Sequence, residues 1–328
     1  MKHANISIFI PHIGCPHKCS FCDQRTISGT QKAPTGAEVR EICSKALAES
    51  KSLENTEIAF FGGSFTAIPK SYMCELLLAV QDFIGEGKFK GIRISTRPDY
   101  ITPGILDILK EYGVKSIELG AQSMVNHVLE ANERGHTAED VYKASDLIKS
   151  YGFELGLQMM IGLYESTADD ELETMEKIIE IRPDTVRIYP VVVLKNTKLG
   201  ELYKSGSYRM FTFEQVVNMS SSAMAEFERN GIRVIKCGLH ASEFVEKDML
   251  GGFYHPAFRE LCEGLIYRYN MEYYINETDR NYIFAVNSLC ISKAVGQKKS
   301  NIEYFSRQGI NIKIIGDENI LKYHVELG

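Results

Sequence analysis

Residues 6–10, ISIFI, and residues 14–24, GCPHKCSFCDQ, decide the fold, because they place three cysteines directly after an apolar run. ISIFI has the β-branched, apolar composition of a strand buried in a sheet. Cys15, Cys19 and Cys22 then follow at spacings of four and three residues. Thiolates are soft ligands that select zinc, copper(I) or iron–sulfur clusters. The segment therefore predicts a metal centre in the loop after the first strand.

Similar apolar runs recur along the chain and alternate with helical patterns. After the first run they cover residues 58–62, 92–96, 116–120, 155–162, 185–193 and 232–238. Between them lie helical segments such as TPGILDILKEYG, which Thr102 and Pro103 open and Gly113 ends. Near-continuous apolar strands separated by helices indicate a parallel sheet covered on both faces. A doubly wound sheet would place a glycine-rich turn where this chain has cysteines, so we predict an α/β fold with a partial or complete β/α barrel.

The rhythm changes after about residue 240, where aromatic and mixed segments replace the regular alternation. We predict a barrel domain at residues 1–240 and a smaller C-terminal α/β module at residues 241–328. The chain has 328 residues, 44% of them apolar, which is enough for both cores.

The cysteine content and the net charge indicate in which compartment the protein works and which partners it binds. Eight cysteines are too sparse for a disulfide framework and fit a reducing compartment, so we expect a cytoplasmic protein. The first residues lack the apolar run of a signal peptide, and nowhere do about 18 consecutive apolar residues occur, so no membrane contact is expected. The net charge of -6 argues mildly against a protein that coats nucleic acid without specificity.

Three cysteines leave one position of a tetrahedral metal site open. In a zinc site His12 or His17 would be the fourth ligand, and a chance group of buried thiols is the simplest alternative. In a β/α barrel, however, chemistry sits on loops at the carboxyl ends of strands, where these cysteines fall. One loop with this spacing can hold three corners of a cuboidal iron–sulfur cluster, which we favour.

The pattern Cys15-x3-Cys19-x-Phe21-Cys22 resembles the CxxxCxΦC motif of the radical S-adenosylmethionine (SAM) superfamily. The resemblance implies a [4Fe–4S] cluster whose fourth iron is left open for the amino and carboxylate groups of SAM. It also implies the chemistry: one electron from the cluster cleaves SAM to methionine and a 5′-deoxyadenosyl radical, which attacks a substrate. The cofactors would supply the reactivity and the protein the orientation.

Two later segments resemble SAM-binding motifs of the same superfamily. FFGGSFTAIP, after the second apolar run, resembles its glycine-rich motif, which implies that Gly62 and Gly63 let the backbone approach the amino group of SAM. Ser64 stands where many members have an acidic residue or threonine. Ser95 stands where relatives often carry a SAM-binding glutamate. Glycine pairs after a strand are common turn elements, so the place of this pair after the second strand is what carries the argument.

Residues 119–137, LGAQSMVNHVLEANERGHT, resemble the radical SAM cores of the Elongator catalytic subunit and of oxygen-independent coproporphyrinogen oxidase. This resemblance implies that Gln122 and Arg134 contact SAM, with Arg134 as the bidentate partner of its carboxylate. An exposed salt bridge on a helix is the ordinary alternative for such an arginine.

The fifth and sixth runs extend the resemblance to about residue 240. LGLQMMIG resembles the strand end that supports the adenine of SAM, which implies that Gln158 points inward and that Ile161 and Gly162 lie against the base. Arg187 and Tyr189 would face the substrate cavity as candidate catalytic residues, with a buried structural pair as the alternative.

The tail is similar to a KH RNA-binding module, in which a GxxG loop clamps a nucleotide backbone. Here the loop reads Gly296-Gln297-Lys298-Lys299, so its second glycine is replaced. Lys298 and Lys299 beside the amino end of a helix would form a phosphate site and are candidate substrate-binding residues. A solvated lysine turn is the alternative. His240 and His255 are further candidates, although such histidines are more often capping or core residues.

Three functions stay open at this point. The first is a radical SAM enzyme that modifies RNA, most plausibly a tRNA base, with flavodoxin or ferredoxin as electron donor. The second is a small-molecule enzyme of the coproporphyrinogen oxidase type. A cluster of arginines able to hold propionates would favour it, and the sequence displays no obvious one. The third is a metal-binding RNA-binding protein without enzymatic activity. The Elongator subunit carries an acetyltransferase domain after its core, and because this chain ends at Gly328 we do not expect acetyl-CoA chemistry.

Overall fold

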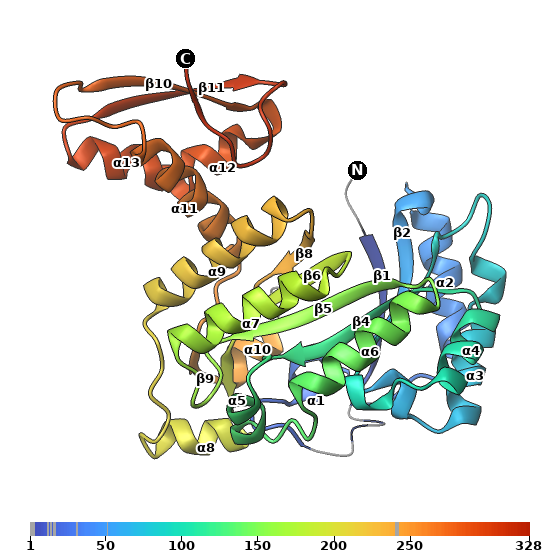
Figure 1. Ribbon diagram of the computed structural model, residues 1–328. Coiled ribbons are helices and arrows are strands. Elements are labelled where there is room, and N and C mark those ends of the chain that lie inside the picture. The colour runs from blue at the N-terminus through green and yellow to red at the C-terminus, as the bar shows by residue number, and fades with distance from the viewer. Residues whose placement is uncertain are drawn as a thin grey trace.

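Seven parallel strands form one curled sheet in the computed structural model, which describes residues 4–11, 13, 15, 18–30, 32–50, 52–239 and 243–328 (Figure 1). In sheet order the strands are β1 (Ala4–Ile10), β2 (Thr56–Gly62), β3 (Gly91–Thr96), β4 (Val114–Gln122), β5 (Glu154–Ile161), β6 (Thr185–Pro190) and β8 (Arg233–Cys237). Within the described residues no pairing joins β8 back to β1. The predicted α/β barrel is therefore confirmed in its partial form.

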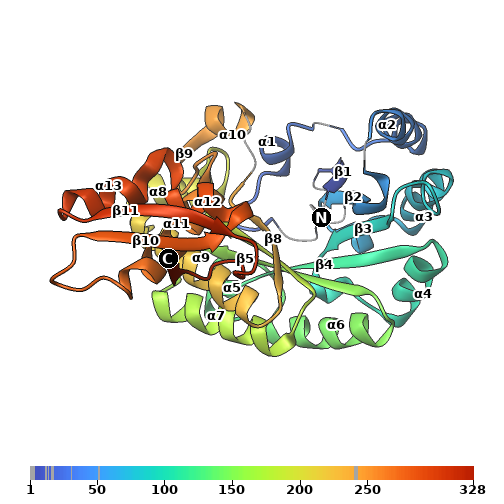
Figure 2. The same cartoon turned by 90° about the horizontal axis from the view of Figure 1, so that it is seen from above.

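Helices cover the outer face of the sheet, as the view along it shows (Figure 2). They are α2 (Gly36–Glu49), α3 (Lys70–Ala79), α4 (Pro103–Glu111), α6 (Ala138–Ser150), α7 (Ala168–Ile181) and α9 (Phe213–Arg229). The short helices α5 (Asn126–Ala131) and α8 (Lys198–Lys204) lie at the lower end of the barrel in Figure 1. Short 3₁₀ turns lie at Leu53–Asn55, Phe65–Ala67, Gln81–Phe83, Pro98–Tyr100, Ser288–Cys290 and Gln297–Lys299. Threonine starts many of these helices, and Thr102 caps α4 as predicted, because its hydroxyl accepts from the N–H of Ile105 at 3.4 Å.

The predicted strand at residues 185–193 is wrong in its second half. The strand β6 ends at Pro190, and Val192–Leu194 forms β7, which pairs antiparallel with β9 (Met249–Gly252). Proline lacks the N–H that a central ladder needs, so it marks the point where the chain leaves the sheet. An uninterrupted apolar run concealed this change of direction.

The open side of the half-barrel, between β1 and β8, is covered by two short helices. These are α1 (Gln24–Ser28) and α10 (Glu243–Asp248), which lie side by side at the top of Figure 2. A small apolar cluster of Val192, Leu194 and Val245, with Ile27 packed against it, joins them to β7. The helices α1 and α10 thus cover the space inside the curled sheet.

The C-terminal part forms a separate sheet of three strands, in the order β11-β10-β12. Its elements are β10 (Asn281–Asn287), α12 (Ile291–Val295), α13 (Ser300–Arg307), β11 (Asn311–Asp317) and β12 (Glu326–Leu327). The helix α11 (Phe258–Glu272) packs on α9 and connects this module to the barrel. The small α/β module is thus confirmed, and the boundary at residue 240 stays a prediction.

One hydrophobic cluster runs from the barrel helices through α11 into the module, from Ile8 to Val325. Shared apolar burial of this kind is the main stabilising contribution to the packing of the two parts. None of the helices in the described residues has the length and apolar character that crossing a bilayer would require.

Candidate active site

The cysteine segment leaves β1 and is fixed by polar contacts with distant helices. The hydroxyl of Ser20, between Cys19 and Cys22, donates to the side chain of Asn132 at 2.8 Å, and the carbonyl of Ser20 accepts from Leu199 N–H at 2.7 Å. Ser20 is completely buried, so these bonds are protected from water. A segment without regular secondary structure is thereby held against the carboxyl ends of the strands.

All three thiols of this segment are free and at least partly buried. Burial and the nearby Cys19 together raise the pKa of Cys22 to about 12, against the opposing effect of a hydrogen bond from Gln24 at 3.2 Å. Burial likewise raises the pKa of Cys15. Thiols in this environment become ligands only when a cation compensates the loss of their protons.

Among the described residues, no three side chains of His, Cys, Asp or Glu are grouped around a point where one metal ion would fit. A cuboidal cluster binds its thiolates through separate irons and does not require that grouping. His12 and His17, the alternative zinc ligands, lie outside the described residues.

A small cavity of about 100 Å³ adjoins the cysteines and brings together most of the predicted SAM contacts. It is lined by Cys15, Cys19, Cys22, Gly62, Gly63, Ser64, Ser95, Gln122, Arg134 and Gln158, among others. These residues come from the ends of five different strands or from the loops that follow them. The strand-by-strand motif positions in the sequence therefore converge in space.

Arg134 and Gln122 have buried polar atoms without partners in this cavity. Arg134 donates to Cys19 Sγ at 3.0 Å and to the carbonyl of Gly120 at 2.5 Å, but its Nε has no partner among the described residues. The Oε1 atom of Gln122 is also buried without a partner there, and Gln122 has a positive φ of 68°. One unmatched donor and one unmatched acceptor suit a ligand with a carboxylate and an ammonium group, such as the methionine part of SAM.

The glycine pair has a packing role beside the predicted ligand role. A Cβ on Gly63 would lie 2.3 Å from the carbonyl oxygen of Ile13, and one on Gly62 would lie 2.8 Å from that of Ile10. The N–H of Gly63 donates to the carbonyl of Ile10 at 2.7 Å. The pair therefore lets the end of β2 approach the backbone that leads to the cysteines.

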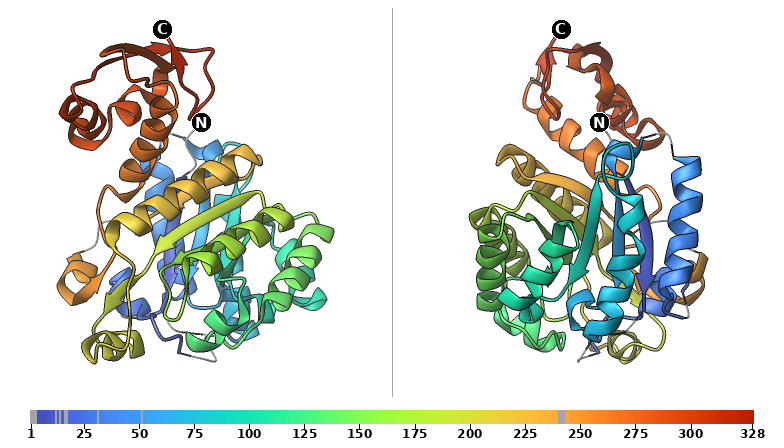
Figure 3. Two further views of the ribbon diagram at one scale, coloured as in Figure 1. Left: turned by 60° about the vertical axis from the view of Figure 1, so that its left-hand side comes forward. Right: turned by 90° about the vertical axis from the view of Figure 1, so that its right-hand side faces the viewer.

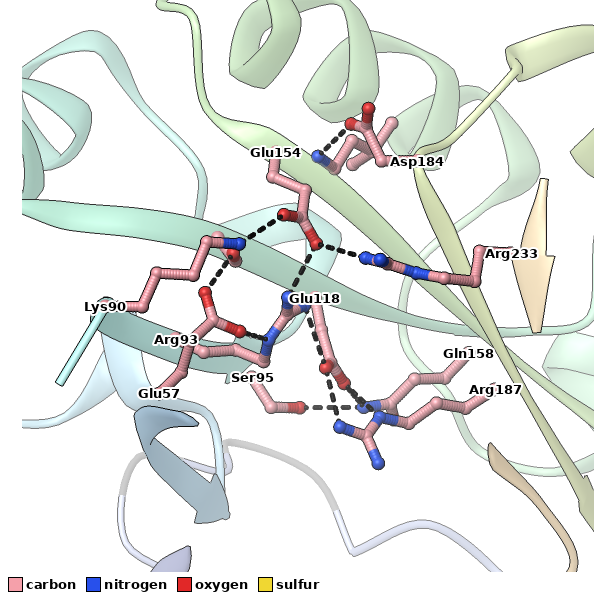
Figure 4. A network of polar contacts seen from close by, with 12 residues as sticks. Glu57, Lys90, Arg93, Ser95, Glu118, Glu154, Gln158, Asp184, Arg187 and Arg233 are labelled. Carbon is pink, nitrogen blue, oxygen red and sulfur yellow. Dashed lines mark hydrogen bonds and ion pairs between the residues drawn. The ribbon is translucent and has the colours of Figure 1, made fainter. Parts of the chain in front are cut away.

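Ser64, Ser95 and Gln158 are tied into polar contacts. The hydroxyls of Ser64 and Thr96 lie 2.9 Å apart, which links the ends of β2 and β3. Gln158 Nε2 donates to Ser95 Oγ at 3.1 Å and to Glu118 Oε2 at 3.0 Å. As predicted, Gln158 points to the inside of the sheet (Figure 4).

Ile161 and Gly162 are not brought into the lining of either cavity at the site. Ile161 is 1% exposed and belongs to the hydrophobic core. Gly162 has φ 86°, and its N–H donates to the buried carboxylate of Glu171 at 2.8 Å. Their predicted contact with adenine stays a prediction, which the arrangement of these two residues does not favour.

A larger cavity of about 440 Å³ continues from the SAM cavity along the inside of the sheet. Arg187 and Tyr189 line it, as predicted, beside Phe61, Gln158 and Lys236. The two cavities share residues including Cys22, Gly62 and Gln122. A molecule in the larger cavity would therefore lie next to one bound at the cysteines.

A buried ionic network beneath this cavity was not anticipated from the sequence (Figure 4). Arg93 is completely buried and donates to Glu57 at 2.7 Å, Glu118 at 3.2 Å and Glu154 at 2.6 Å. Arg187 donates to both oxygens of Glu118, at 2.7 and 2.9 Å. The sequence signal was a charged residue within or directly before the runs concerned: Arg93, Glu118 and Arg187 lie within theirs, and Glu57 and Glu154 directly precede theirs.

The network also sets the charge of its central carboxylate. Burial raises the pKa of Glu118, but the charge and hydrogen bonds of Arg187, together with Arg93, outweigh burial and hold that pKa below its ordinary value. Arg187 is thus an anchored ion pair partner, and its guanidinium lies over the ring of Phe61 at 5.0 Å. Arg187 therefore has both of the roles that the sequence analysis gave as alternatives: it belongs to a buried ion pair, and it lines the larger cavity.

The remaining candidates that the structure describes are not part of the lining of either cavity. The Nδ1 atom of His255 accepts from the N–H of Ala257 at 3.0 Å, which is a local turn contact, and His240 lies outside the described residues. Lys298 and Lys299 lie in the C-terminal module, at the opposite end of the molecule from α1 and the cysteine segment (Figures 1 and 3). The structure does not bring these two lysines together with the SAM cavity.

Comparison with known families identifies the class. Residues 9–178 match the model of the Radical SAM superfamily, and residues 183–268 match the Radical_SAM C-terminal domain. The chain belongs to the radical SAM superfamily. It is accordingly an enzyme that uses a [4Fe–4S] cluster and SAM, as predicted.

Two curated relatives agree with the predicted likeness to the Elongator subunit. Elongator complex protein 3 of Saccharomyces cerevisiae is 29% identical over 194 residues, which are 53% of this chain and 35% of the yeast protein. The tRNA uridine(34) acetyltransferase of Methanocaldococcus infernus is 26% identical over 260 residues, which are 67% of this chain and 49% of the archaeal protein. The chain thus spans between about a third and a half of the length of these relatives.

Solved structures confirm the fold. The archaeal Methanocaldococcus infernus Elp3 with an N-terminal deletion has a TM-score of 0.66 at 19% identity, over 90% of this chain and 69% of that one. Coproporphyrinogen III oxidase (HemN) of Escherichia coli has a TM-score of 0.53 at 16% identity, over 70% of this chain and 53% of that one. Both predicted resemblances are therefore confirmed at the level of the fold.

The residues present fit these cofactors. Cys15, Cys19 and Cys22 would hold the cluster, and Gln122 and Arg134 would hold the methionine part of SAM through the unmatched atoms described above. When bound, the cluster supplies the electron that cleaves SAM to methionine and a 5′-deoxyadenosyl radical. The chain orients the ligands: Asn132 and Arg134, just after α5, bind the cysteine segment through Ser20 and Cys19.

Proposed function

We propose that this enzyme modifies RNA, and that its substrate is a tRNA base. The observation that carries the proposal is the continuous space from the cysteines into a cavity of about 440 Å³ with aromatic and amide walls. Phe9, Phe61 and Tyr189 contribute aromatic rings to its wall, and Asn5 and Gln158 contribute amide groups. The Nε2 atom of Gln158 already donates to Ser95 and Glu118, which fixes the orientation of this amide. Unpaired bases are recognised by such stacking surfaces and by hydrogen bonds to their edges.

The named relatives support an RNA substrate. The archaeal relative is a tRNA uridine(34) acetyltransferase, and its match includes 67% of this chain. The present chain spans only part of that protein, so a common substrate is a proposal about this chain. Membership in an enzyme family sets aside the non-enzymatic alternative.

The C-terminal module would then contribute a distant contact with the same RNA. The order β10, α12, loop, α13 and β11 matches the predicted strand, helix, loop, helix and strand, and Lys298 and Lys299 lie in the loop. A tRNA is long enough to contact a module and a cavity at opposite ends of one protein. Flavodoxin or ferredoxin as electron donor and a cytoplasmic location belong to the same proposal.

The test is anaerobic reconstitution of the cluster, followed by addition of SAM and dithionite and detection of 5′-deoxyadenosine with and without total tRNA. We expect formation of 5′-deoxyadenosine to rise with tRNA. The triple variant C15A/C19A/C22A is the control and should contain neither iron nor cleavage activity. Cleavage that ignores tRNA would contradict the RNA substrate and favour a small molecule of the coproporphyrinogen type.

A further inference from the structure

Lys236 is a cation in the wall of the larger cavity that the sequence did not single out. It lies on β8, and a bulge between β6 and β8 sets its position. Val186 pairs with Val234, but Arg187 pairs with Lys236, so Ile235 is the additional residue. The bulge turns Lys236 to the inner face beside Arg187, and two cations become neighbours on adjacent strands.

The two cations differ in their partners. Arg187 is neutralised by Glu118 through two hydrogen bonds of 2.7 and 2.9 Å. No carboxylate among the described residues lies within 4.0 Å of the Lys236 ammonium, which is partly withdrawn from water. Burial lowers the pKa of Lys236, and the charges of Arg187 and Arg259 lower it further.

An ammonium group in this position is costly unless a ligand compensates it. Removal from water and a neighbouring cation both disfavour the charge. The same lysine lines a cavity of about 440 Å³ that continues to the cysteines. Unpaired, partly buried charges in a cavity mark functional sites, because their partner arrives with the ligand.

We propose that Lys236 binds an oxyanion of the substrate, a phosphate or a carboxylate, inside the larger cavity. The inference rests on the proposed function, because it takes this cavity as the substrate site. Arg134, which lines the smaller cavity and not the larger one, is the expected partner of the SAM carboxylate. The oxyanion therefore belongs to the second molecule that occupies the site.

The experiment measures binding to the reconstituted enzyme saturated with SAM, without reductant, by anaerobic titration calorimetry. Two matched pairs of probes separate the sources of the oxyanion: uridine 5′-monophosphate against uridine, and succinate against succinamide. We expect the charged member of one pair to bind at least about tenfold more tightly than its neutral partner. Preference for the nucleotide identifies a phosphate, and preference for succinate identifies a carboxylate.

Variants connect that preference to the lysine. Lys236→Met should abolish the preference, Lys236→Arg should retain it, and Lys110→Met on the outer helix α4 should leave it unchanged. If Lys236→Met does not fold, protection of Lys236 in the unaltered chain from acetic anhydride by the charged probe replaces it. Equal binding of both members of both pairs, a preference that survives Lys236→Met, or absence of protection would overturn the inference.

The outcomes also separate this inference from the proposed function. A preference that depends on Lys236, in an enzyme whose SAM cleavage ignores tRNA, supports the oxyanion site and contradicts the RNA substrate. SAM cleavage that rises with tRNA, in an enzyme without such a preference, supports the RNA substrate and overturns the oxyanion site.

Discussion

Arg93 and Glu118 hold the inner face of the sheet together at the level of single residues. Arg93 joins carboxylates from β2, β4 and β5, and Glu118 receives both Arg93 and Arg187. Each is almost completely buried, at 0% and 1% exposure of the side chain. Every charge in the centre of the network therefore depends on its neighbours for compensation.

We predict that Arg93→Leu destabilises the protein by about 3 to 5 kcal/mol, because it leaves Glu57 and Glu118 buried with fewer partners. Urea unfolding of both chains measures the difference. Arg307→Leu is the matched control, because it removes an exposed arginine that pairs with Glu303 on the surface of α13. Its effect should be much smaller. Equal effects of the two substitutions would show that the buried network contributes little.

Glu171 gives the fold a dependence on pH. Burial raises the pKa of Glu171 to about 7, although hydrogen bonds from Gly162 and Ser166 oppose it. Between the ordinary pKa of a glutamate and pH 7 the folded chain thus keeps a proton that the unfolded chain has lost. Stability from this residue is present at low pH and is lost as the pH rises to about 7.

We expect Glu171→Gln to remove this dependence, because an amide does not ionise. From pH 5 to pH 8 the unaltered chain should lose about 2 to 3 kcal/mol relative to the variant. Urea unfolding measures the free energy of unfolding of the unaltered chain and of Glu171→Gln at pH 5 and at pH 8. The effects of the other titrating groups are common to the two proteins and cancel when their changes with pH are compared. Parallel pH profiles would contradict the raised pKa.

At the scale of elements, the close approach of two neighbouring strand ends, those of β1 and β2, positions the cysteine segment. The end of β2 at Gly62 and Gly63 lies against the backbone of Ile10 and Ile13, directly before the first cysteine. We predict that Gly63→Ala destabilises the chain by about 1 to 3 kcal/mol, because its Cβ would overlap the Ile13 carbonyl. The displaced segment should also lose most of its iron after reconstitution, which an iron assay measures.

Gly104→Ala is the control for this pair of strands. It makes the same substitution in the first turn of α4, where nothing lies within 4 Å of the added Cβ. Its iron content should equal that of the unaltered chain. A normal iron content in Gly63→Ala would mean that the segment adapts to the added methyl group.

At the scale of the whole molecule, the sequence predicts the order of elements better than their contacts. Apolar runs gave the strands because parallel strands are buried on both faces, and the cysteine motif gave the end of the sheet that carries the site. Arg93 was missed because its partners depend on register, and Lys236 was missed because register decides the face of the sheet on which it lies. Bulges between β3 and β4 and between β6 and β8 shift that register by one residue. No local pattern in one strand encodes a neighbour's bulge.

The distance between the C-terminal module and the cysteines also could not be predicted from the sequence. The helix α11 begins beside Gly238, at the carboxyl end of β8. The module contacts the far end of α9, where Lys322 pairs with Glu228 at 2.5 Å. These contacts place the module away from the site, and only packing determines them. An RNA that reaches both parts would have to bridge them.

The last prediction follows from that bridging. If the lysine loop holds phosphates of a tRNA, the double variant K298E/K299E should weaken tRNA binding about tenfold or more. The slope of log affinity against log salt should also decrease by about one for each phosphate that the loop no longer neutralises. Filter binding of the reconstituted enzyme at several salt concentrations measures both quantities. The double variant R307E/K313E, which reverses two charges on α13 and β11 of the same module, controls for net charge. Equal weakening in the two variants would mean that tRNA responds to overall charge, and the loop would then be an ordinary solvated turn.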